Sequence, residues 1–168
     1  MMNKRGRQEN QTVIGVISDT HGLIRPEALR VLEGADLIIH AGDIGALDVI
    51  SALEAIADVT AIKGNNDRGA WAGKFPETAV IKVGKMKIFV VHDVKELDGN
   101  PSAEGFRVVI SGHSHNPSLV EKNGVLYLNP GSAGPRRFKL PIAVARIHVE
   151  GSSVAAEIIK LEAFGKTP

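Results

Sequence analysis

The sequence predicts an α/β protein in which two β-sheets pack face to face and helices flank them. In the first half of the chain, short apolar runs alternate with helical patterns, an order typical of parallel strands joined by right-handed crossovers. In the second half, strand-like segments follow one another through short turns, and several of them form hairpins. Two packed sheets flanked by helices accommodate both patterns.

The first half contains three predicted strands and two predicted helices. Its opening strand reads Val-Ile-Gly-Val-Ile, a composition typical of a strand buried on both faces. Pro26 stands near the start of the first helix and Gly34 follows its end, as helix boundaries favour. In chain order the elements are predicted at residues 13–17, 25–33, 36–41, 47–57 and 58–63. The second helix is predicted to face the core with Leu47, Ile50, Leu53, Ile56 and Ala57.

The second half contains seven predicted strands, at residues 79–83, 86–92, 107–111, 118–122, 125–129, 142–148 and 154–161. Hairpin turns are predicted at residues 84–85, 123–124 and 151–152. The long irregular connections lie at residues 68–78 and 93–104. Both follow candidate ligands, so we expect them to border the functional site.

The composition is that of an ordinary soluble globular protein. Hydrophobic residues make up 43% and charged residues 23% of the 168 residues, which fits one domain, expected at residues 12–168. The polar and basic residues 1–11 are expected to form a flexible leader, because they lack the apolar centre of a secretory signal. No apolar run approaches the roughly 18 residues of a membrane span.

The charge and the lack of cysteine limit the partners. Without cysteine, any metal must be held by oxygen and nitrogen ligands, and a cytoplasmic location is expected. The formal net charge is +1, and basic residues are scattered, so nucleic acid and membranes are not expected as partners. The sequence leaves a homo-oligomer open.

Five predicted strands end in the same way, with a turn that carries His, Asp or Asn beside Gly or Ser. In open α/β sheets, ligands bind outside the carboxyl ends of the strands, so these turns are predicted to meet at one crevice. The turns occupy residues 18–22, 41–43, 63–67, 91–93 and 111–115. In the first turn, Asp19 and His21 are two residues apart, which allows both side chains to reach one point.

Taken singly, these turns have ordinary structural explanations. A histidine such as His92 or His113 is more often buried for packing than for metal binding, and Asn65-Asn66-Asp67 is typical of an Asx turn. His113-Ser114-His115 is more specific, because two imidazoles on either side of a small residue seldom occur without a metal. The recurrence of five such turns in one chain favours a metal site.

The turns supply seven candidate metal ligands: Asp19, His21, Asp43, Asn65, His92, His113 and His115. Two ions that share a bridging carboxylate would each receive about four of them. Mixed imidazole and oxygen ligands suit manganese, iron, zinc, cobalt or nickel. Two ions about 3.5–4 Å apart stabilise the attacking and leaving oxygens at phosphorus and acidify a bound water, so the pattern predicts phosphoester hydrolysis.

In their order and intervals, these motifs resemble those of the calcineurin-like metallophosphoesterase superfamily, and more closely its small single-domain bacterial and archaeal phosphodiesterase branch. The resemblance runs from residue 13 to about 149 and includes Asn129-Pro130-Gly131-Ser132, which is similar to a turn of that branch. It implies a four-layer α/β/β/α fold with the metals at the carboxyl edge of the sheets. It also implies a phosphodiesterase that hydrolyses small phosphodiesters with a metal-bridging hydroxide.

The resemblance implies a role for each candidate residue by position. The first of two divalent ions would bind Asp19, His21, Asp43 and His115. Asp43 would bridge to the second ion, which Asn65, His92 and His113 complete. The residues expected to act most directly in catalysis are Asp43, Asn65 and His92. Manganese or nickel is the expected metal, with zinc, iron and cobalt as alternatives.

Two further residues are expected to support these ligands without binding the ions. His40 precedes the turn that carries Asp43 and matches a frequent residue of the superfamily, although plain packing within the strand explains it equally well. Asp67 closes the turn that carries Asn65.

Two residues depart from the usual pattern of the superfamily. Asn66 stands where many members carry a histidine that is thought to protonate the leaving group, so slow turnover and a preference for stable leaving groups are expected. Asp93 follows His92 where a glycine is common, and its carboxylate could order His92 or point to solvent.

A non-catalytic interaction module, as in the retromer small subunit, is the main alternative function. Such proteins resemble this fold and bind protein partners through its surface, but their ligand sets are usually degraded. All seven candidate ligands are present here. A nuclease would require a basic groove or a capping domain, and the sequence shows neither.

Overall fold

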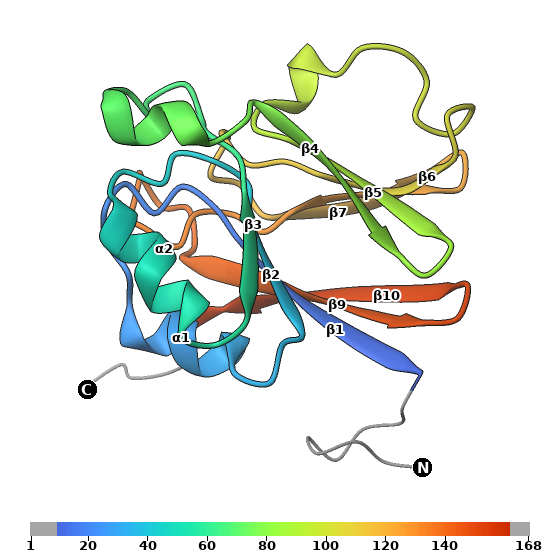
Figure 1. Ribbon diagram of the computed structural model, residues 1–168, viewed down its shortest axis with the longest axis horizontal. Coiled ribbons are helices and arrows are strands. Elements are labelled where there is room, and N and C mark those ends of the chain that lie inside the picture. The colour runs from blue at the N-terminus through green and yellow to red at the C-terminus, as the bar shows by residue number, and fades with distance from the viewer. Residues whose placement is uncertain (1–9, 162–168) are drawn as a thin grey trace.

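The computed structural model describes residues 10–161, which form two five-stranded sheets packed face to face (Figure 1). Every strand and helix predicted from the sequence is present, with bounds that differ by at most three residues from the predicted ones. The predicted leader at residues 1–11 lies mostly outside the described residues. Residue 11 itself already belongs to the first strand.

The first sheet has the strand order β10-β9-β1-β2-β3. Its strands are β1 (Gln11–Ile17), β2 (Leu37–His40), β3 (Asp58–Ala61), β9 (Ala143–Glu150) and β10 (Ser153–Lys160). Strands β1, β2 and β3 are parallel, as the alternation of strands and helices predicts. The sheet is nevertheless mixed, because β9 pairs with β1 in the antiparallel sense and β10 pairs with β9.

The second sheet has the strand order β4-β5-β6-β8-β7. Its strands are β4 (Thr78–Val83), β5 (Met86–Val91), β6 (Phe106–Ile110), β7 (Ser118–Lys122) and β8 (Val125–Asn129). Strands β5, β6 and β8 are parallel to one another, and the antiparallel strands β4 and β7 form the edges. Each sheet therefore has three parallel strands with neighbouring carboxyl ends.

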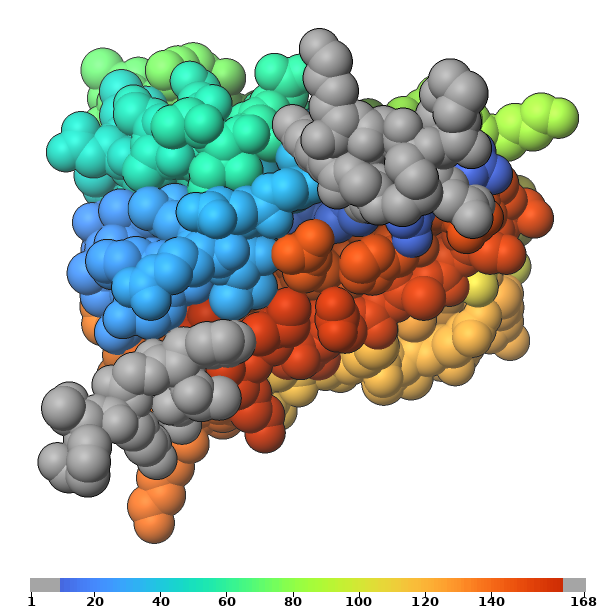
Figure 2. Space-filling view, turned by 90° about the horizontal axis from the view of Figure 1, so that it is seen from below, coloured from blue at the N-terminus to red at the C-terminus, as the bar shows by residue number. Residues whose placement is uncertain are grey.

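Two helices cover the outer side of the first sheet: α1 (Pro26–Leu32) and α2 (Leu47–Glu54). Seen from below, this side is shared between the helices, in blue and cyan, and strands β9 and β10, in orange and red (Figure 2). Two 3-10 turns, η1 (Ala70–Lys74) and η2 (Val94–Glu96), lie within the connections predicted to be irregular. None of the helices within residues 10–161 is long and apolar enough to span a membrane.

One residue of α2 was predicted on the wrong face. Leu47 is 37% exposed, whereas Val49 is fully buried beside Ile50 and Leu53. At 100° per residue, Leu47 lies about a third of a turn from the centre of the face that these three residues form. The inward face of the helix therefore begins two residues later than predicted.

The core follows the two-residue period of the strands. Alternate residues of β1 point to opposite sides: Ile14 and Val16 pack between the sheets, whereas Ile17 packs under the helices. Alternate apolar residues of β5, β6 and β8, such as Ile88, Ile110 and Leu128, complete the layer between the sheets. Both faces of β1 are buried, as its composition predicts.

Hydrogen bonds join the turns that follow the parallel strands. The Asp19 N–H donates to the Gly42 carbonyl at 3.0 Å, within the first sheet. Across the sandwich, the Ala133 N–H donates to the Ser18 carbonyl at 3.0 Å. In the second sheet, the Gly112 N–H donates to the carbonyl of His92 at 2.9 Å. The polar turns of both sheets consequently meet at one edge of the molecule, as predicted.

Candidate metal centre

Asp19 lies at the centre of this edge and is fully buried. Its Oδ2 accepts hydrogen bonds from Ser18 Oγ at 2.7 Å and from the His113 N–H at 3.0 Å. Its Oδ1 lies 3.4 Å from His115 Nε2 and 3.9 Å from His92 Nε2. One carboxylate thus links the turn after β1 with two histidine-bearing turns of the other sheet.

Asp43 lies beside Asp19, at the end of β2, and is 2% exposed. Its Oδ2 is 3.3 Å from His92 Nε2 and 3.7 Å from His21 Nε2. These two histidines are predicted to bind different ions, so Asp43 has the position that a bridging carboxylate requires. Asp19 also contacts histidines of both sets, so both carboxylates lie between the two predicted ion positions.

Asn66 has a role that the sequence did not indicate. Its side-chain amide donates to Asp43 Oδ2 and its backbone N–H donates to Asp43 Oδ1, both at 2.9 Å. The sequence interpretation considered Asn66 as part of an Asx turn and as the position of a missing proton donor. The structure shows that Asn66 instead fixes the orientation of the predicted bridging carboxylate.

Replacing Asn66 with alanine should therefore weaken metal binding. The variant keeps the backbone hydrogen bond but loses the one to Oδ2, and losing such a supporting contact typically costs about 10–100-fold in metal affinity or activity. Titration with Mn²⁺, followed by calorimetry, measures the change. Asn65→Ala, at the adjacent predicted ligand, provides the comparison, and equal affinities of Asn66→Ala and the unmodified protein would contradict the role of the amide.

His92 has its ring orientation fixed by a backbone contact. Nδ1 lies 2.7 Å from the Ala41 carbonyl and must donate to it, which leaves Nε2 directed toward Asp19 and Asp43. Burial acts to lower the pKa of His92, but the contacts with Asp43, the Ala41 carbonyl and Asp19 outweigh it and raise the pKa to about 9. The same negative field would attract a divalent cation to Nε2.

The two carboxylates have lowered pKa values in spite of their burial. Burial acts to raise the pKa of Asp19, and contacts with His115, Ser18 and His92 more than offset it. Burial likewise acts to raise the pKa of Asp43, and contacts with His92 and Asn66 hold it well below the usual range. Both groups are therefore anionic at neutral pH, as metal ligands must be.

Two predicted ligands stand apart from this cluster. His113 Nε2 faces Asp93 Oδ2 at 3.7 Å, and the His113 side chain is 44% exposed. Asn65 is exposed and lines, together with His92 and His113, a cleft of about 510 Å³. The structure thus brings Asp19, His21, Asp43, His92 and His115 into contact and places Asn65 and His113 on the wall of the same cleft.

The donor atoms fit a pair of metal ions. Among residues 10–161, four buried side-chain atoms of the site have no hydrogen-bond partner: Asp19 Oδ1, His21 Nε2, His92 Nε2 and His115 Nδ1. Buried polar atoms rarely lack partners, so these four require an explanation. Ligand atoms that gather within 4.8 Å form two groups that share Asp19: Asp19 with His21 and His115, and Asp19 with Asp43 and His92. Asp19 Oδ1, His21 Nε2 and His92 Nε2 are unpaired and lie within this cluster, whereas His115 faces Asp19 with its other nitrogen, Nε2. Buried oxygen and nitrogen atoms that converge in this way are what a dinuclear site needs.

Backbone strain is concentrated at the same residues. Five of the seven described non-glycine residues with a left-handed φ are predicted ligands, with φ between 48° and 70°: Asp19, His21, Asp43, His113 and His115. Such conformations cost about 1–3 kcal/mol each and persist where the surroundings enforce them, typically at functional sites. They bend the chain after β1, β2 and β6, where five of the seven predicted ligands lie.

Three glycines allow the turns to approach the ligands closely. A Cβ atom at Gly112 would collide with Ser18 Oγ and with Asp19 Oδ2, and one at Gly64 would collide with the Asp43 carboxylate. A Cβ at Gly42 would lie 2.6 Å from His92 Nδ1. Glycine beside the ligands was visible in the sequence, but the residue that each glycine contacts was not.

His40 and Asp67 make hydrogen bonds to the turns that carry the predicted ligands. The Asp67 carboxylate accepts hydrogen bonds from the N–H groups of Ile44, Gly45 and Gly64, which ties the turn after β3 to the turn after β2. His40 is fully buried. Its Nδ1 accepts from the Gly42 N–H at 3.1 Å, so its Nε2 carries the proton and donates to Thr20 Oγ1 at 2.9 Å.

Because it is buried, His40 should make the stability of the protein depend on pH. Burial lowers the pKa of His40 from 6.5 to about 4, so between these values the unfolded chain binds a proton that the folded chain does not. The free energy of unfolding should then fall by about 2 kcal/mol between about pH 7.5 and pH 5 from this group alone. His40→Gln keeps a donor to Thr20 but cannot titrate. Urea unfolding at both pH values should show a smaller decrease for this variant, and an equal decrease would contradict the assignment.

The Asn129-Pro130-Gly131-Ser132 turn makes hydrogen bonds to the segments that carry the predicted ligands. The Asn129 amide donates to the Gly112 carbonyl at 2.9 Å and to Ser114 Oγ at 3.0 Å. Ser132 Oγ donates to the Asp19 carbonyl at 3.0 Å. The turn therefore holds the ligand-bearing segments of both sheets in place.

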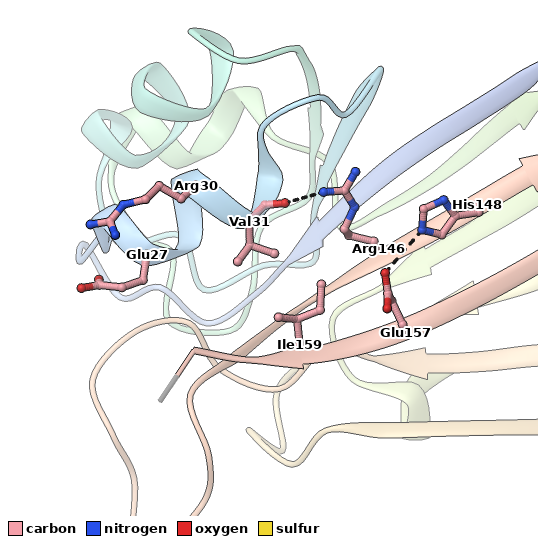
Figure 3. Close-up of a pocket in the computed structure, with 7 residues that line it drawn as sticks. All are labelled: Glu27, Arg30, Val31, Arg146, His148, Glu157 and Ile159. Atoms are coloured by element: carbon pink, nitrogen blue, oxygen red, sulfur yellow. Dashed lines mark hydrogen bonds and ion pairs between the residues drawn. The ribbon is translucent and has the colours of Figure 1, made fainter. Parts of the chain in front are cut away.

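A second cleft, of about 410 Å³, lies between α1 and strands β9 and β10 (Figure 3). Two of its polar contacts are internal: an Arg146 guanidinium nitrogen donates to the Val31 carbonyl at 2.8 Å, and His148 Nε2 lies 3.5 Å from Glu157 Oε1. No group of potential metal ligands lies there among the described residues. The polar groups that converge without partners are those at the strand ends.

Residues 13–152 match the calcineurin-like phosphoesterase superfamily domain. The chain belongs to this superfamily. A probable metallophosphoesterase of Methanothermobacter thermautotrophicus is 33% identical over 160 residues, which cover 88% of this chain and 92% of that protein. A phosphodiesterase of Methanocaldococcus jannaschii is 30% identical over 137 residues, 70% of this chain and 82% of that protein. The family resemblance predicted from the motifs is thereby confirmed.

Solved structures confirm the fold expected of the superfamily. A predicted phosphoesterase of Streptococcus pneumoniae is 26% identical and superposes with a TM-score of 0.70 over 92% of both chains. Vps29 of Entamoeba histolytica, in a complex with Zn²⁺, is 23% identical and superposes with a TM-score of 0.67, over 89% of this chain and 99% of that chain. The second similarity shows that Vps29 shares the fold.

Proposed function

We propose that this chain is a metal-dependent phosphodiesterase that hydrolyses small phosphodiesters at a site for two divalent ions. Its membership of a phosphoesterase superfamily supports hydrolysis of phosphate esters as the reaction class. The Methanocaldococcus phosphodiesterase among its relatives supports a phosphodiester as the substrate. The observation that carries the proposal is the pair of donor groups around Asp19 and Asp43, with four buried atoms that have no other partner.

The residues of the chain have separate tasks in this proposal. Asp19, His21, Asp43 and His115 would hold the first ion, and Asp43, Asn65, His92 and His113 would hold the second. The bound ions supply a hydroxide nucleophile near neutral pH and positive charge for the phosphoryl oxygens. Asn66 and the Ala41 carbonyl keep Asp43 and His92 in orientation.

The substrate preference follows from the lack of a proton donor at position 66. The Asn66 side chain is bound to Asp43 and carries no acidic proton, so the leaving group must depart as a stable anion. Aryl diesters should therefore react faster than alkyl diesters. The cleft of about 510 Å³ suits a small substrate. Manganese or nickel in a cytoplasmic setting remains our expectation.

The decisive test is hydrolysis of bis(p-nitrophenyl) phosphate by metal-stripped protein, before and after addition of Mn²⁺, Ni²⁺, Zn²⁺ or Mg²⁺ singly. We expect activity only after a transition metal is added, and a higher rate on this diester than on p-nitrophenyl phosphate. A higher rate on the monoester would show that the protein is a phosphomonoesterase rather than a phosphodiesterase. If the protein binds two ions but hydrolyses neither ester with any metal, the proposed enzymatic function is contradicted.

The alternative function is a protein-interaction module, which the likeness in fold to Vps29 favours. The same experiment separates the two functions, because an interaction module requires no turnover. The buried, strained and convergent donor groups favour metal binding, and the hydrolysis experiment decides whether the metal serves an enzyme.

A further inference from the structure

Asp93 lies at the wall of the metal cleft, directly after His92 and at the start of η2. Its Oδ1 accepts a hydrogen bond from the Lys95 N–H at 3.0 Å, which caps the turn and fixes the carboxylate. Its other oxygen, Oδ2, faces His113 rather than His92. The contact with His113 is thus additional to the two roles that the sequence left open, ordering of His92 and exposure to solvent, and the Asp93 side chain is 24% exposed.

The distance between Asp93 and His113 is the distance between two ligands of one ion. Donor atoms that each lie about 2.1 Å from a shared ion are at most about 4.2 Å apart. Asp93 Oδ2 and His113 Nε2 are 3.7 Å apart, which is too long for a hydrogen bond but within this limit. His21 Nε2 and Asp43 Oδ2, two atoms predicted to share the first ion, are separated by the same 3.7 Å.

We propose that Asp93 is an eighth protein ligand of the metal centre and binds the second ion, together with His113, through Oδ2. This proposal rests on the two-ion site of the proposed function. His113 and Asp93 both lie outside the Asp19–Asp43–His92 group, and Asp93 is the carboxylate that His113 faces. Glu96 lines the same cleft but has no comparable contact with a predicted ligand.

An additional carboxylate changes the chemistry of the second ion. Without Asp93, its protein ligands are one shared carboxylate, one amide and two imidazoles. With Asp93, a second anionic oxygen is added, which favours a higher coordination number and a harder cation such as Mn²⁺ over Zn²⁺. A glycine at this position, which is common in the superfamily, cannot contribute a ligand, so the preference for Mn²⁺ should be a property of this chain.

The test measures metal binding directly. Metal-stripped full-length protein, Asp93→Gly and Asp93→Asn are titrated with Mn²⁺ and with Zn²⁺ by calorimetry, and bound metal is counted by mass spectrometry. We expect one site to keep its affinity for Mn²⁺ and the other to bind Mn²⁺ at least about 10-fold more weakly in both variants. The affinity for Zn²⁺ should decrease less. Glu96→Gln is the matched control, because it removes a charge from the same cleft and should leave both affinities unchanged.

Asp93→Asn also separates a ligand from a residue that only orients His113. An asparagine oxygen still accepts a hydrogen bond from an imidazole N–H, so a purely orienting role would be preserved in this variant. The Co²⁺ protein supplies the readout, since its visible absorption strengthens as the coordination number decreases. We expect stronger absorption in Asp93→Gly, which removes the donor atom, whereas an asparagine oxygen can still coordinate, as Asn65 is proposed to do. Unchanged spectra in Asp93→Gly together with unchanged affinities in Asp93→Asn would overturn the proposal.

The outcome does not depend on the enzymatic function. If the unmodified protein binds two ions but does not hydrolyse bis(p-nitrophenyl) phosphate, the proposed phosphodiesterase function is refuted. The titrations still decide the role of Asp93 in that case. If hydrolysis is observed and both variants retain full affinity for two ions, the inference about Asp93 fails and the enzyme stands. Binding of fewer than two ions by the unmodified protein would overturn both.

Discussion

Asp43→Asn should abolish hydrolysis and lower the number of bound ions from two to one or none. The carboxylate contacts His21 and His92 at 3.7 Å and 3.3 Å, so it is the group that both predicted ions share. Asparagine has nearly the same shape but no charge, so the two cations would lose the negative group between them. We expect a decrease in kcat/KM of at least about 100-fold, because a group that only supports a ligand already contributes about 10–100-fold.

Metal counting and the rate on bis(p-nitrophenyl) phosphate measure the two effects together. Asp58→Asn is the matched control, since Asp58 is an exposed aspartate at the start of β3, the opposite end from the site. This variant should retain both activity and metal. Full activity in Asp43→Asn would disprove the shared carboxylate, and a variant that keeps two ions but no activity would assign Asp43 to the reaction rather than to binding.

Gly112→Ala is expected to have an effect nearly as large, although it removes no polar group. The new methyl group would collide with Ser18 Oγ and Asp19 Oδ2, so either the carboxylate or the turn after β6 must move. The same turn carries His113 and His115, and the Gly112 N–H donates to the His92 carbonyl. A displacement of this kind should lower metal affinity and kcat together, and overpacking typically costs about 1–3 kcal/mol of stability.

Gly73→Ala is the appropriate control, because a methyl group at Gly73 would contact nothing within 4 Å. It should leave metal binding, activity and stability nearly unchanged. Thermal unfolding of both variants separates misfolding from local displacement. A folded Gly112→Ala protein with normal activity would show that the turn can move away from Asp19 without affecting the site.

The sequence predicted the elements well because the relevant patterns are local. The apolar run of β1 and the turn residues after it lie within ten positions, and the bounds of β7 and β8 were predicted without error. The position of Leu47 was wrong because the helical period alone does not show where a helix face meets the sheet. The pairing of β9 with β1 was not predicted either, since nothing in the sequence of β9 specifies a partner more than a hundred residues away.

The candidate site also has features that could be predicted from the sequence and features that could not. Strand ends with Asp, His and Asn beside glycine are recognisable from the sequence, because the carboxyl ends of parallel strands meet at one edge by topology. The hydrogen bonds of Asn66 to Asp43 could not be predicted, because they join turns that are 23 residues apart. The same holds for the contact between Gly112 and Asp19, which joins the two sheets.

By itself, the sequence determined the order of the strands and helices, the residues available as ligands and the family to which they belong. These properties depend on composition and on short-range periodicity, which the chain carries from residue to residue. Only the tertiary structure decided which carboxylate oxygen faces which imidazole, that Asp93 faces His113, and which glycines must remain glycines. Those properties depend on distances of a few ångströms between separate turns, and packing of the two sheets sets these distances.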